Sequence, residues 1–431
     1  MKIAVIHLGF FYAGGGERLV LEQVQGLRRL GHDVELFAPI VDRDACFPEL
    51  IDQVGVHKLV PHPPKWLPGR VAFAVFLSCL LAPVLALRFR RFDVILAANQ
   101  PSLWIALCAA QVLGKSYVAY LAQPNRVLYP RAIDLSVPHP NLDYRIFRMI
   151  ATVLRPIVRR WDHLAVDRAS LVLANGSYMA GVLEGIYARP FESCPAGSHP
   201  GLESAITGAR REGGLVAGEL VLPKPYVLLT NRHFAVKRFD YAIRALRLVP
   251  GAHLVITGAF TAYTDEVRRL ASDLGVADRV IFTGLVSDTV LSRLYSEAAV
   301  YVYPAPEEDY GMGIVEAMGH GVPVVAWRSA GPTSSVESGV NGMLVEPFDE
   351  EKFGRTINTL VVDPVQADKL GRAAWLRVND GLGYASHCQH LASTLSVAAA
   401  HPKRRHEAGR DDGLDTPAPT FREEVSRATP Q

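Results

Sequence analysis

The stretch that decides the fold class runs from residue 2 to residue 38 and reads KIAVIHLGFFYAGGGERLVLEQVQGLRRLGHDVELFA. Its two short apolar runs, Lys2–Leu8 and Val34–Ala38, are typical of buried parallel strands. Between them, the apolar residues of Glu17–Leu30 recur at helical spacing, and Gly31 stands where a helix should end. The order of strand, glycine loop, helix and strand predicts one βαβ unit.

The same alternation continues along the rest of the chain. Further strands of the first half are expected at Phe92–Ala97, Ser116–Leu121 and Leu171–Ala174. In the second half, strands are expected at Tyr226–Thr230, His253–Gly258, Val280–Thr283, Val300–Pro304 and Val322–Trp327, and helices at Phe239–Leu248, Thr264–Leu274, Thr289–Glu297 and Val315–His320. Two such series predict an α/β protein with two Rossmann-like, doubly wound parallel-sheet domains.

Composition shifts divide the chain into segments. We expect an N-terminal domain over residues 1–200 and a C-terminal domain over residues 221–375. The stretch 201–220, rich in Gly, Ala and charge, is interpreted as a linker. A helix is expected over 376–398, and few apolar residues remain to form a core in 399–431, so this last segment is predicted to be a mobile tail.

Charge and cysteine usage exclude several classes of function. The 431 residues carry a formal net charge of +2, which gives no field for nucleic acid. The five cysteines are scattered without a C-x-x-C pair, and the histidines lack ligand spacing, so we expect no disulfide framework and no metal site. A reducing cytoplasm, or the inner face of a membrane, is the expected location.

Two cations follow the first strand of the second half. Arg232 and Lys237 lie just beyond Tyr226–Thr230, and the carboxyl ends of strands are where doubly wound sheets bind ligands. Their charge suits an anionic ligand, especially a diphosphate. A pair of solvated surface charges is the alternative interpretation.

A glycine-flanked acidic turn follows Val300–Pro304. Gly311 and Gly313 allow close approach of the backbone, and free N–H groups at the helix start favour phosphate. Glu308 and Glu316 accept hydrogen bonds from hydroxyls, so this turn suits a phosphate and a sugar together. Acidic residues placed to favour the helix dipole are the alternative, which explains Glu316 better than Glu308.

A run of three glycines in the first half, Gly14-Gly15-Gly16, offers a second place where backbone amides could meet phosphate. The run follows the first expected strand and precedes a helix. A tight turn is the alternative interpretation, because a glycine run is weak evidence by itself.

These motifs, taken in order, carry a family resemblance over nearly the whole chain up to about residue 395. The matching pieces are Gly14–Arg18, Arg232-x4-Lys237, Ile281–Asp288, Glu308-x7-Glu316, Gly321–Ala326 and Ser338–Gly342. The sequence resembles the retaining glycosyltransferases of the GT-B fold, the group 1 and family 4-like enzymes that include many mannosyl- and glucosyltransferases. The resemblance implies two domains facing a central cleft, with the helix near Tyr384–Ala398 returning to the first domain.

The resemblance also implies a reaction and a donor site. A mannose- or glucose-type hexose would pass from a nucleotide diphosphate-sugar to a glycan or lipid-linked acceptor in polysaccharide or glycolipid synthesis, without a metal or other cofactor. Arg232 and Lys237 would bind the diphosphate, Glu308 would bind the sugar hydroxyls, and Glu316 would bind the ribose. The catalytic candidates are Arg232, Lys237 and Glu308. The other donor-binding candidates are Gly15, Gly16, Gly258, Gly284, Leu285, Gly311, Met312, Gly313 and Ile314.

One position departs from the family pattern. Many relatives carry a histidine in a Tyr-x-His-x-Pro context, where this chain has Ala122. Gln123, Asn125 and Arg126 are therefore the acceptor-side candidates. The departure leaves open a non-catalytic subunit that binds the nucleotide-sugar, and an epimerase of the same fold.

An apolar stretch, Val71–Leu87, interrupts the first half and is followed by basic residues. A buried helix is the preferred interpretation, because the stretch precedes a strand of the sheet. The alternative is peripheral contact with an anionic membrane, aided by the bases Arg145, Arg148, Arg155, Arg159 and Arg160.

Overall fold

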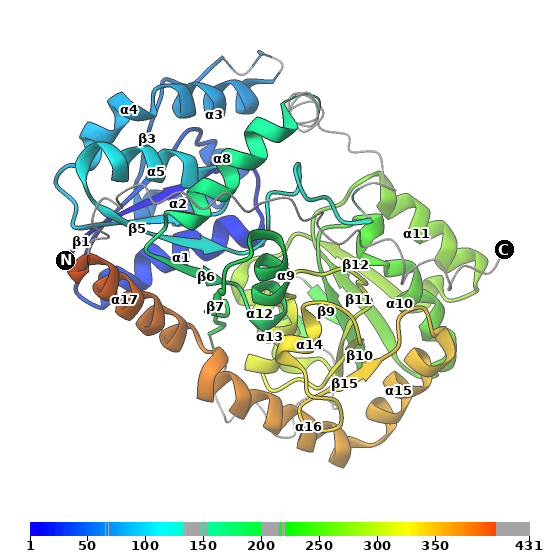
Figure 1. Ribbon diagram of the computed structural model, residues 1–431. Helices are drawn as coiled ribbons and strands as arrows, with labels where there is room; N and C mark the ends of the chain where they lie inside the picture. Colours follow the sequence, from blue (N-terminus) through cyan, green and yellow to red (C-terminus); the bar gives the residue numbers. More distant parts are fainter. Residues whose placement is uncertain are drawn as a thin grey trace.

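The computed structural model describes residues 1–64, 66–67, 69–132, 134, 149, 154–199, 215–217 and 220–401. It contains two parallel sheets, each with helices on both faces, and so confirms the predicted fold class (Figure 1). The predicted linker 201–220 lies outside the described residues except at 215–217 and 220, and the predicted tail lies outside them from residue 402.

The first sheet has seven strands in the order β3-β2-β1-β4-β5-β6-β7. Its strands are β1 (Lys2–His7), β2 (Asp33–Ala38), β3 (Val56–Lys58), β4 (Val94–Ala98), β5 (Ser116–Leu121), β6 (Leu171–Ala174) and β7 (Glu192–Ser193). β1 pairs in parallel with β2 and β4, Ile3 standing opposite both Val34 and Val94. The strand order reverses at β1, which places a ligand-binding crevice beyond the carboxyl ends of β1 and β4.

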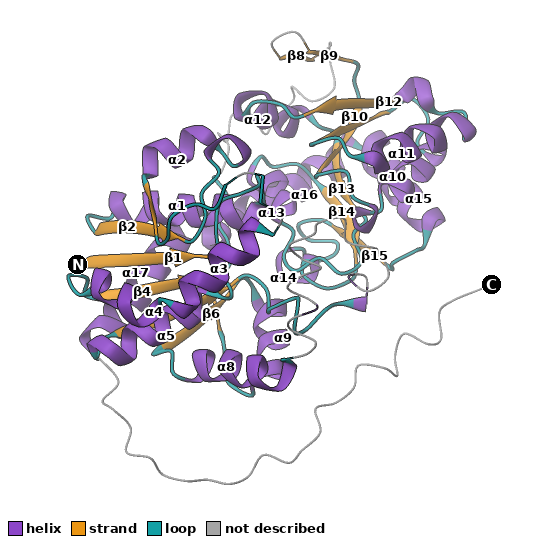
Figure 2. Ribbon diagram, turned by 90° about the horizontal axis from the view of Figure 1, so that it is seen from above, coloured by secondary structure: helices purple, strands orange, loops and turns teal. Residues whose placement is uncertain are grey.

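Helices cover both faces of this sheet (Figure 2). They are α1 (Gly15–Arg29), α2 (Pro48–Val54), α3 (Arg70–Leu80), α4 (Ala82–Leu85), α5 (Ser102–Leu113), α8 (Arg155–Asp167) and α9 (Ser177–Tyr187). The buried residues of α1 and α2 form one core with one face of the sheet, and those of α3, α4, α5, α8 and α9 form a second core with the other face.

The second sheet has six strands in the order β12-β11-β10-β13-β14-β15. They are β10 (Tyr226–Thr230), β11 (His253–Thr257), β12 (Val280–Gly284), β13 (Val300–Tyr303), β14 (Val324–Trp327) and β15 (Met343–Val345). Its helices are α10 (Phe239–Ala245), α11 (Ala262–Asp273), α12 (Asp288–Glu297), α13 (Met312–Gly319), α14 (Pro332–Ser335), α15 (Glu350–Val362) and α16 (Pro364–Arg377). Here the order reverses between β10 and β13, so the loops after these two strands border the second crevice.

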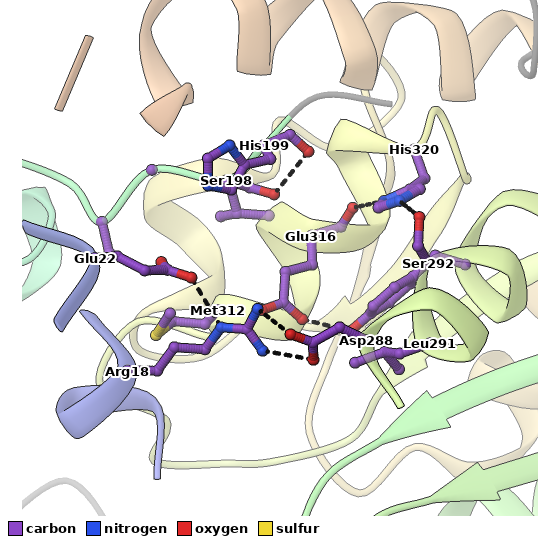
Figure 3. A pocket seen from close by; sticks show the side chains of 14 residues that line it. Arg18, Glu22, Ser198, His199, Asp288, Leu291, Ser292, Met312, Glu316 and His320 are labelled. Carbon is purple, nitrogen blue, oxygen red and sulfur yellow. Dashed lines mark hydrogen bonds and ion pairs between the residues drawn. The ribbon is translucent and has the colours of Figure 1, made fainter. Parts of the chain in front are cut away.

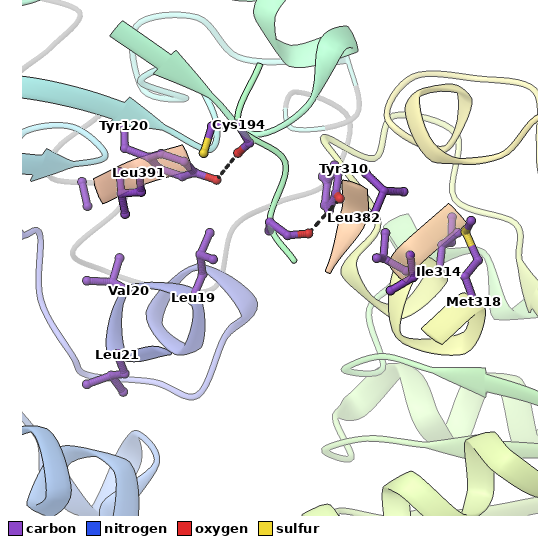
Figure 4. Packing of buried hydrophobic residues seen from close by; sticks show 14 of the residues in the cluster. Leu19, Val20, Leu21, Tyr120, Cys194, Tyr310, Ile314, Met318, Leu382 and Leu391 are labelled. Atoms are coloured by element: carbon purple, nitrogen blue, oxygen red, sulfur yellow. Dashed lines mark hydrogen bonds between the residues drawn. The ribbon is translucent and has the colours of Figure 1, made fainter. Parts of the chain in front are cut away.

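The last helix, α17 (Tyr384–Ala400), packs on α1 and β5 of the first domain. The chain crosses over at Gly383, which bridges to Ser198 where the chain leaves the first domain. One hydrophobic cluster therefore includes residues of both domains, with Leu391 of α17 near Tyr120 and Leu382 near Ile314 (Figure 4). This shared core holds the two crevices face to face.

The prediction of one buried helix over Val71–Leu87 is wrong. The stretch breaks after Leu80 into α3 and a second helical segment, Ala82–Phe89, and the two are bent by 68°. Pro83 near the start of α4 cannot supply the N–H that a continuous helix would need. About half of the large apolar side chains of Val71–Leu87 are exposed. Among the described residues, no single helix combines the length and the apolar character needed to cross a membrane.

Candidate functional site

A cation and a carboxylate meet at the carboxyl ends of β10 and β13. Lys237 ends a short 3₁₀ turn after β10, and Glu308 lies in the loop between β13 and α13. The Lys237 Nζ donates to Glu308 Oε2 at 2.5 Å. The hydroxyl of Tyr303, the last residue of β13, donates to the same oxygen at 2.6 Å. Two residues predicted from the sequence thus meet, and the third partner, Tyr303, was not predicted.

These partners fix the charge of Glu308. Burial by itself would raise its pKa, but the Lys237 ammonium and the hydrogen bonds from Lys237 and Tyr303 lower the pKa from 4.5 to about 2. The stabilisation that this pair gives the fold is therefore present above pH 4.5, and it is lost progressively as the pH falls from there through about 2. At neutral pH the Glu308 carboxylate only accepts hydrogen bonds, as a contact to sugar hydroxyls requires.

Arg232 reaches across the cleft to the first domain. Its guanidinium carbon lies 4.8 Å from the ring centroid of Tyr12 and 5.1 Å from that of Phe234. Tyr12 belongs to the loop between β1 and α1, which carries the three glycines. Stacking on aromatic rings holds the planar group in place while its charge is kept.

The start of α13 lies beside this cluster. Gly311 precedes the helix with φ of +88°, a backbone conformation that favours glycine. In the described part of the chain, the N–H groups of Met312 and Gly313 have no acceptor, whereas that of Ile314 donates to Gly311 O at 2.9 Å. The expected use of the Ile314 amide for ligand is therefore not supported, because a tight first turn already occupies that donor.

The glycine loop of the first domain faces the same helix start. A Cβ added at Gly15 would lie 3.0 Å from the Met312 sulfur, and one added at Gly16 would lie 3.9 Å from Asn99 Nδ2. The loops that follow β1, β10 and β13 therefore converge on one crevice. Both crevices of the doubly wound sheets are parts of this single site.

Glu316 lies one helical turn deeper than expected. The sequence places it in the first turn of a helix that begins near Val315, but α13 begins at Met312 and Glu316 is in its second turn. The Tyr295 hydroxyl donates to Glu316 Oε2 at 2.7 Å. Burial raises the pKa of Glu316, against the lowering effect of the Tyr295 hydrogen bond. The interpretation that Glu316 favours the helix dipole loses its basis, because that effect is confined to the first turn.

Glu316 borders a pocket of about 230 Å³ between the domains (Figure 3). Its walls are formed by Arg18, Glu22, Ala196, Gly197, Ser198, His199, Asp288, Leu291, Ser292, Tyr295, Met312, Val315, Glu316 and His320. Arg18 crosses the pocket, and both of its terminal nitrogens donate to Asp288 at 3.1 Å. No local pattern in the sequence predicts this pair, because its members are 270 residues apart.

Three other donor-site candidates lie on the β11 and β12 side. Gly284 ends β12 with φ of +71°, and the Leu285 side chain is 76% exposed. Gly258 has φ of +141°, and a Cβ added there would lie 1.8 Å from Asn231 O. The structure therefore gives Gly258 a backbone-packing role that the sequence did not predict.

We predict that Gly258→Ala destabilises the protein by about 3 kcal/mol, because the methyl group clashes with the backbone and the conformation disfavours side chains. Gly185→Ala is the matched control, since a Cβ there meets nothing within 4 Å inside α9. The control should stabilise by about 0.5–1 kcal/mol through helix propensity. Denaturant unfolding of both variants measures the difference, and equal stabilities would contradict the packing role of Gly258.

The acceptor-side candidates lie in the loop after β5. The Ala122 N–H donates to Asn99 Oδ1 at 2.8 Å, and Gln123 is exposed. Asn125 accepts from the Val127 N–H at 3.2 Å, which gives it a local turn contact. Arg126 reaches the second domain, where it forms an ion pair with Asp309.

A second arginine that the sequence did not single out reinforces this contact. Arg131 Nη1 donates to Glu307 O at 2.8 Å and lies 3.5 Å from Asp309 Oδ2. Ion pairs from the first domain thus border the cleft on two sides, at Asp309 and at Asp288. Within the part of the chain that the structure describes, no group of three or more His, Cys, Asp or Glu residues is placed to hold a metal ion.

Two family models match the chain. Residues 13–192 match the model described as Glycosyltransferase Family 4, and residues 217–376 match the model described as Glycosyl transferases group 1. Together these ranges contain the glycine loop, the Lys237–Glu308 pair and the start of α13.

Named relatives agree with the family models. The D-inositol 3-phosphate glycosyltransferase of Mycolicibacterium gilvum is 33% identical over 229 residues, covering 49% of this chain and 51% of that protein. The protein of the same name in Acidothermus cellulolyticus is 29% identical over 372 residues, covering 81% of this chain and 78% of that protein. The chain thus spans about half of the first relative's length. Among solved structures, Anabaena HepE in complex with UDP-glucose has a TM-score of 0.68 at 20% identity, covering 92% of this chain and 100% of that chain.

Proposed function

Because the chain belongs to the GT-B-fold glycosyltransferases of group 1 and family 4, we propose that it transfers a mannose- or glucose-type hexose from a nucleotide diphosphate-sugar to a glycan or lipid-linked acceptor. The proposal includes retention of the anomeric configuration and independence of metal ions. The observation that carries it is the Lys237–Glu308 pair beside the unpaired N–H groups of α13. Cation, acceptor carboxylate and helix start are the partners that a sugar diphosphate needs in one place.

On binding, the donor would replace contacts that the protein's own side chains now make with one another. Lys237 would turn from Glu308 to the diphosphate, and Glu308 would accept hydrogen bonds from sugar hydroxyls. As the bond between the anomeric carbon and phosphate breaks, negative charge grows on the departing diphosphate. Four groups would face this charge: Lys237, Arg232 and the N–H groups of Met312 and Gly313. They interact more strongly with the departing diphosphate than with the intact donor, and this difference lowers the barrier.

The nucleoside would occupy the pocket beside α13. Glu316 offers a carboxylate for the ribose hydroxyls, since only one of its oxygens is engaged by Tyr295. HepE, which shares the fold, was solved in complex with UDP-glucose, and this supports a nucleotide-sugar as the ligand. The two relatives described above are named D-inositol 3-phosphate glycosyltransferases, which supports a hydroxyl-bearing acceptor. The scattered free cysteines of the described residues support a cytoplasmic location.

One observation favours a second candidate, a non-catalytic subunit that binds the nucleotide-sugar. Ala122 stands where many relatives carry a histidine, and its methyl group has no acid–base chemistry. Transfer to an acceptor, or slow hydrolysis of the donor, would support the enzyme, whereas donor binding without either would support the subunit. The configuration at the anomeric carbon of any product, read by proton NMR, tests retention.

We predict that one class among UDP-, GDP- and ADP-sugars raises the melting temperature well above the other two, and that a chelator leaves the shift unchanged. A ligand that binds the folded state at 100 times its Kd stabilises it by about 2.7 kcal/mol. Differential scanning fluorimetry measures the shift. If no nucleotide-sugar stabilises the protein at saturating concentration, the donor site proposed here does not exist.

A further inference from the structure

The outward face of α3 and of the segment after it is apolar. Five large side chains on this face are at least half exposed: Phe73 (50%), Phe76 (63%), Leu80 (64%), Val84 (66%) and Leu87 (63%). Phe73, Phe76 and Leu80 recur at intervals of three or four residues within α3, and Val84 and Leu87 are three apart in the segment beyond the bend. The residues between them include members of the buried core of the first domain. We call these five residues the outer stripe. Single exposed apolar residues are common on protein surfaces, but an ordered series of this size marks an interaction surface.

The charged residues of the segment that carries the outer stripe all have one sign. Residues 64–92 contain five Lys and Arg residues and no Asp or Glu. Arg70 is paired with Asp42, and Arg91 with Glu35. Arg88 and Arg90 have no carboxylate partner among the residues that the structure describes. The stripe therefore ends in cations that the protein itself does not neutralise.

A second helix of the same layer repeats this pattern. Leu154 just before α8, and Ile157 and Trp161 within it, are 43%, 59% and 51% exposed. Arg155 and Arg160 are exposed beside them. α5 packs against both α4 and α8, so the outer stripe and α8 flank the same helix on one side of the first domain (Figure 1).

Both helices begin near the cleft. Arg70, the first residue of α3, bonds to Asp42, which follows β2, at 2.7 Å. Arg155, the first residue of α8, donates to the carbonyl of Leu128, which follows β5, at 3.4 Å. The carboxyl ends of β2 and β5 lie at the cleft edge of the sheet, so this apolar and basic face adjoins the acceptor side of the site.

We propose that this face docks on an anionic membrane surface and so brings a lipid-linked acceptor to the cleft. The delivery of a lipid-linked acceptor rests on the proposed function, whereas the docking on a membrane does not. Apolar side chains on the outer face of a surface helix insert at the boundary between headgroups and acyl chains, and flanking arginines bind anionic lipids. A second copy of the chain fits this face less well, because two like-charged surfaces would meet.

The test is sedimentation of the full chain with vesicles of phosphatidylcholine and phosphatidylglycerol, against vesicles of phosphatidylcholine alone. We expect binding to the anionic vesicles at low salt, weaker binding at high salt and little binding to the neutral ones. Two variants, the double substitution Phe73→Ser with Phe76→Ser and the single substitution Arg90→Glu, should each lower the partition coefficient by about tenfold or more. The matched controls are Val362→Ser with Val365→Ser, at 64% and 79% exposed, and Arg269→Glu in α11.

Three results would overturn the proposal: no sedimentation with anionic vesicles at low salt, wild-type binding by the stripe variants, or a dimer in solution that the Phe73 and Phe76 substitutions dissociate without any vesicle binding. Stabilisation by the nucleotide-sugar is measured on the same samples. If donor binding persists while vesicle binding is absent, only the docking surface is wrong. If donor binding is absent in the wild type, the proposed function itself is wrong.

Discussion

Lys237→Ala is expected to lower kcat/KM by about 10²–10³-fold, the loss typical of removing one donor that stabilises developing negative charge. The Nζ of Lys237 lies 2.5 Å from Glu308 Oε2 and 3.3 Å from the Tyr303 hydroxyl. It is thus held at the carboxyl end of the sheet, where the diphosphate would sit. No other lysine of the described residues lies in this cluster. Steady-state transfer assays with the donor identified by thermal shift would measure the effect.

The substitution also leaves Glu308 buried without its cation, so a loss of activity could reflect a loss of folded protein. Two variants separate these effects. Lys352→Ala removes an exposed lysine from α15 and should leave both activity and melting temperature unchanged. Lys237→Ala combined with Glu308→Gln removes the unpaired charge and should recover stability without recovering activity. Turnover of Lys237→Ala within a few-fold of wild type would remove Lys237 from the reaction.

Glu308→Gln is expected to abolish the contribution of the sugar to donor binding and to lower turnover by about 10²-fold or more. Two donors, the Lys237 ammonium and the Tyr303 hydroxyl, point at Oε2 of this side chain. An amide can satisfy them with its oxygen only, and its NH₂ group then faces hydroxyls that need an acceptor. Calorimetry should show wild-type affinity for the free nucleotide diphosphate and a loss of affinity for the intact donor.

The control for this prediction is Glu351→Gln, which neutralises an exposed carboxylate paired with Arg355 on α15. It should change neither affinity. Equal losses for free nucleotide and intact donor in Glu308→Gln would mean that Glu308 acts by holding Lys237 in place and has no contact with the sugar.

The two predictions are linked by the way that Lys237 and Glu308 satisfy each other. Each is a charged group with about four fifths of its side chain withdrawn from solvent, and neither would be tolerated there alone. The pair keeps both charges in place until a ligand offers each a better partner. Because they act as a unit, we expect the kinetic effects of the two substitutions to be far from additive.

Much of the fold could be predicted from local pattern. The predicted strands Ser116–Leu121, Leu171–Ala174 and Tyr226–Thr230 have the observed bounds, because short apolar runs between turn residues leave little choice of end. The apolar pattern predicts a helix that begins at Val315, whereas α13 begins three residues earlier, at Met312. Gly311 sets that start through its positive φ, and the apolar periodicity does not reveal it.

The stretch Val71–Leu87 shows the limit of composition. When apolar residues occupy every side of a helix, the sequence does not reveal which side packs against the rest of the protein. The packing of α3 and α4 against α5 buries one face and leaves Phe76 and Val84 largely exposed. That distinction changes the interpretation from a core helix to a docking surface.

The sequence by itself determined the alternation of strands and helices, the two parallel sheets, and the cations, glycines and carboxylates that stand at strand ends. These features follow from contacts between residues close in the chain, or from the rule that parallel strands place their carboxyl ends on one edge. Only the tertiary structure decided which of these groups meet: Lys237 with Glu308 and Tyr303, and Arg18 with Asp288. Such pairs join residues that are up to 270 positions apart, and their distances depend on how whole domains pack.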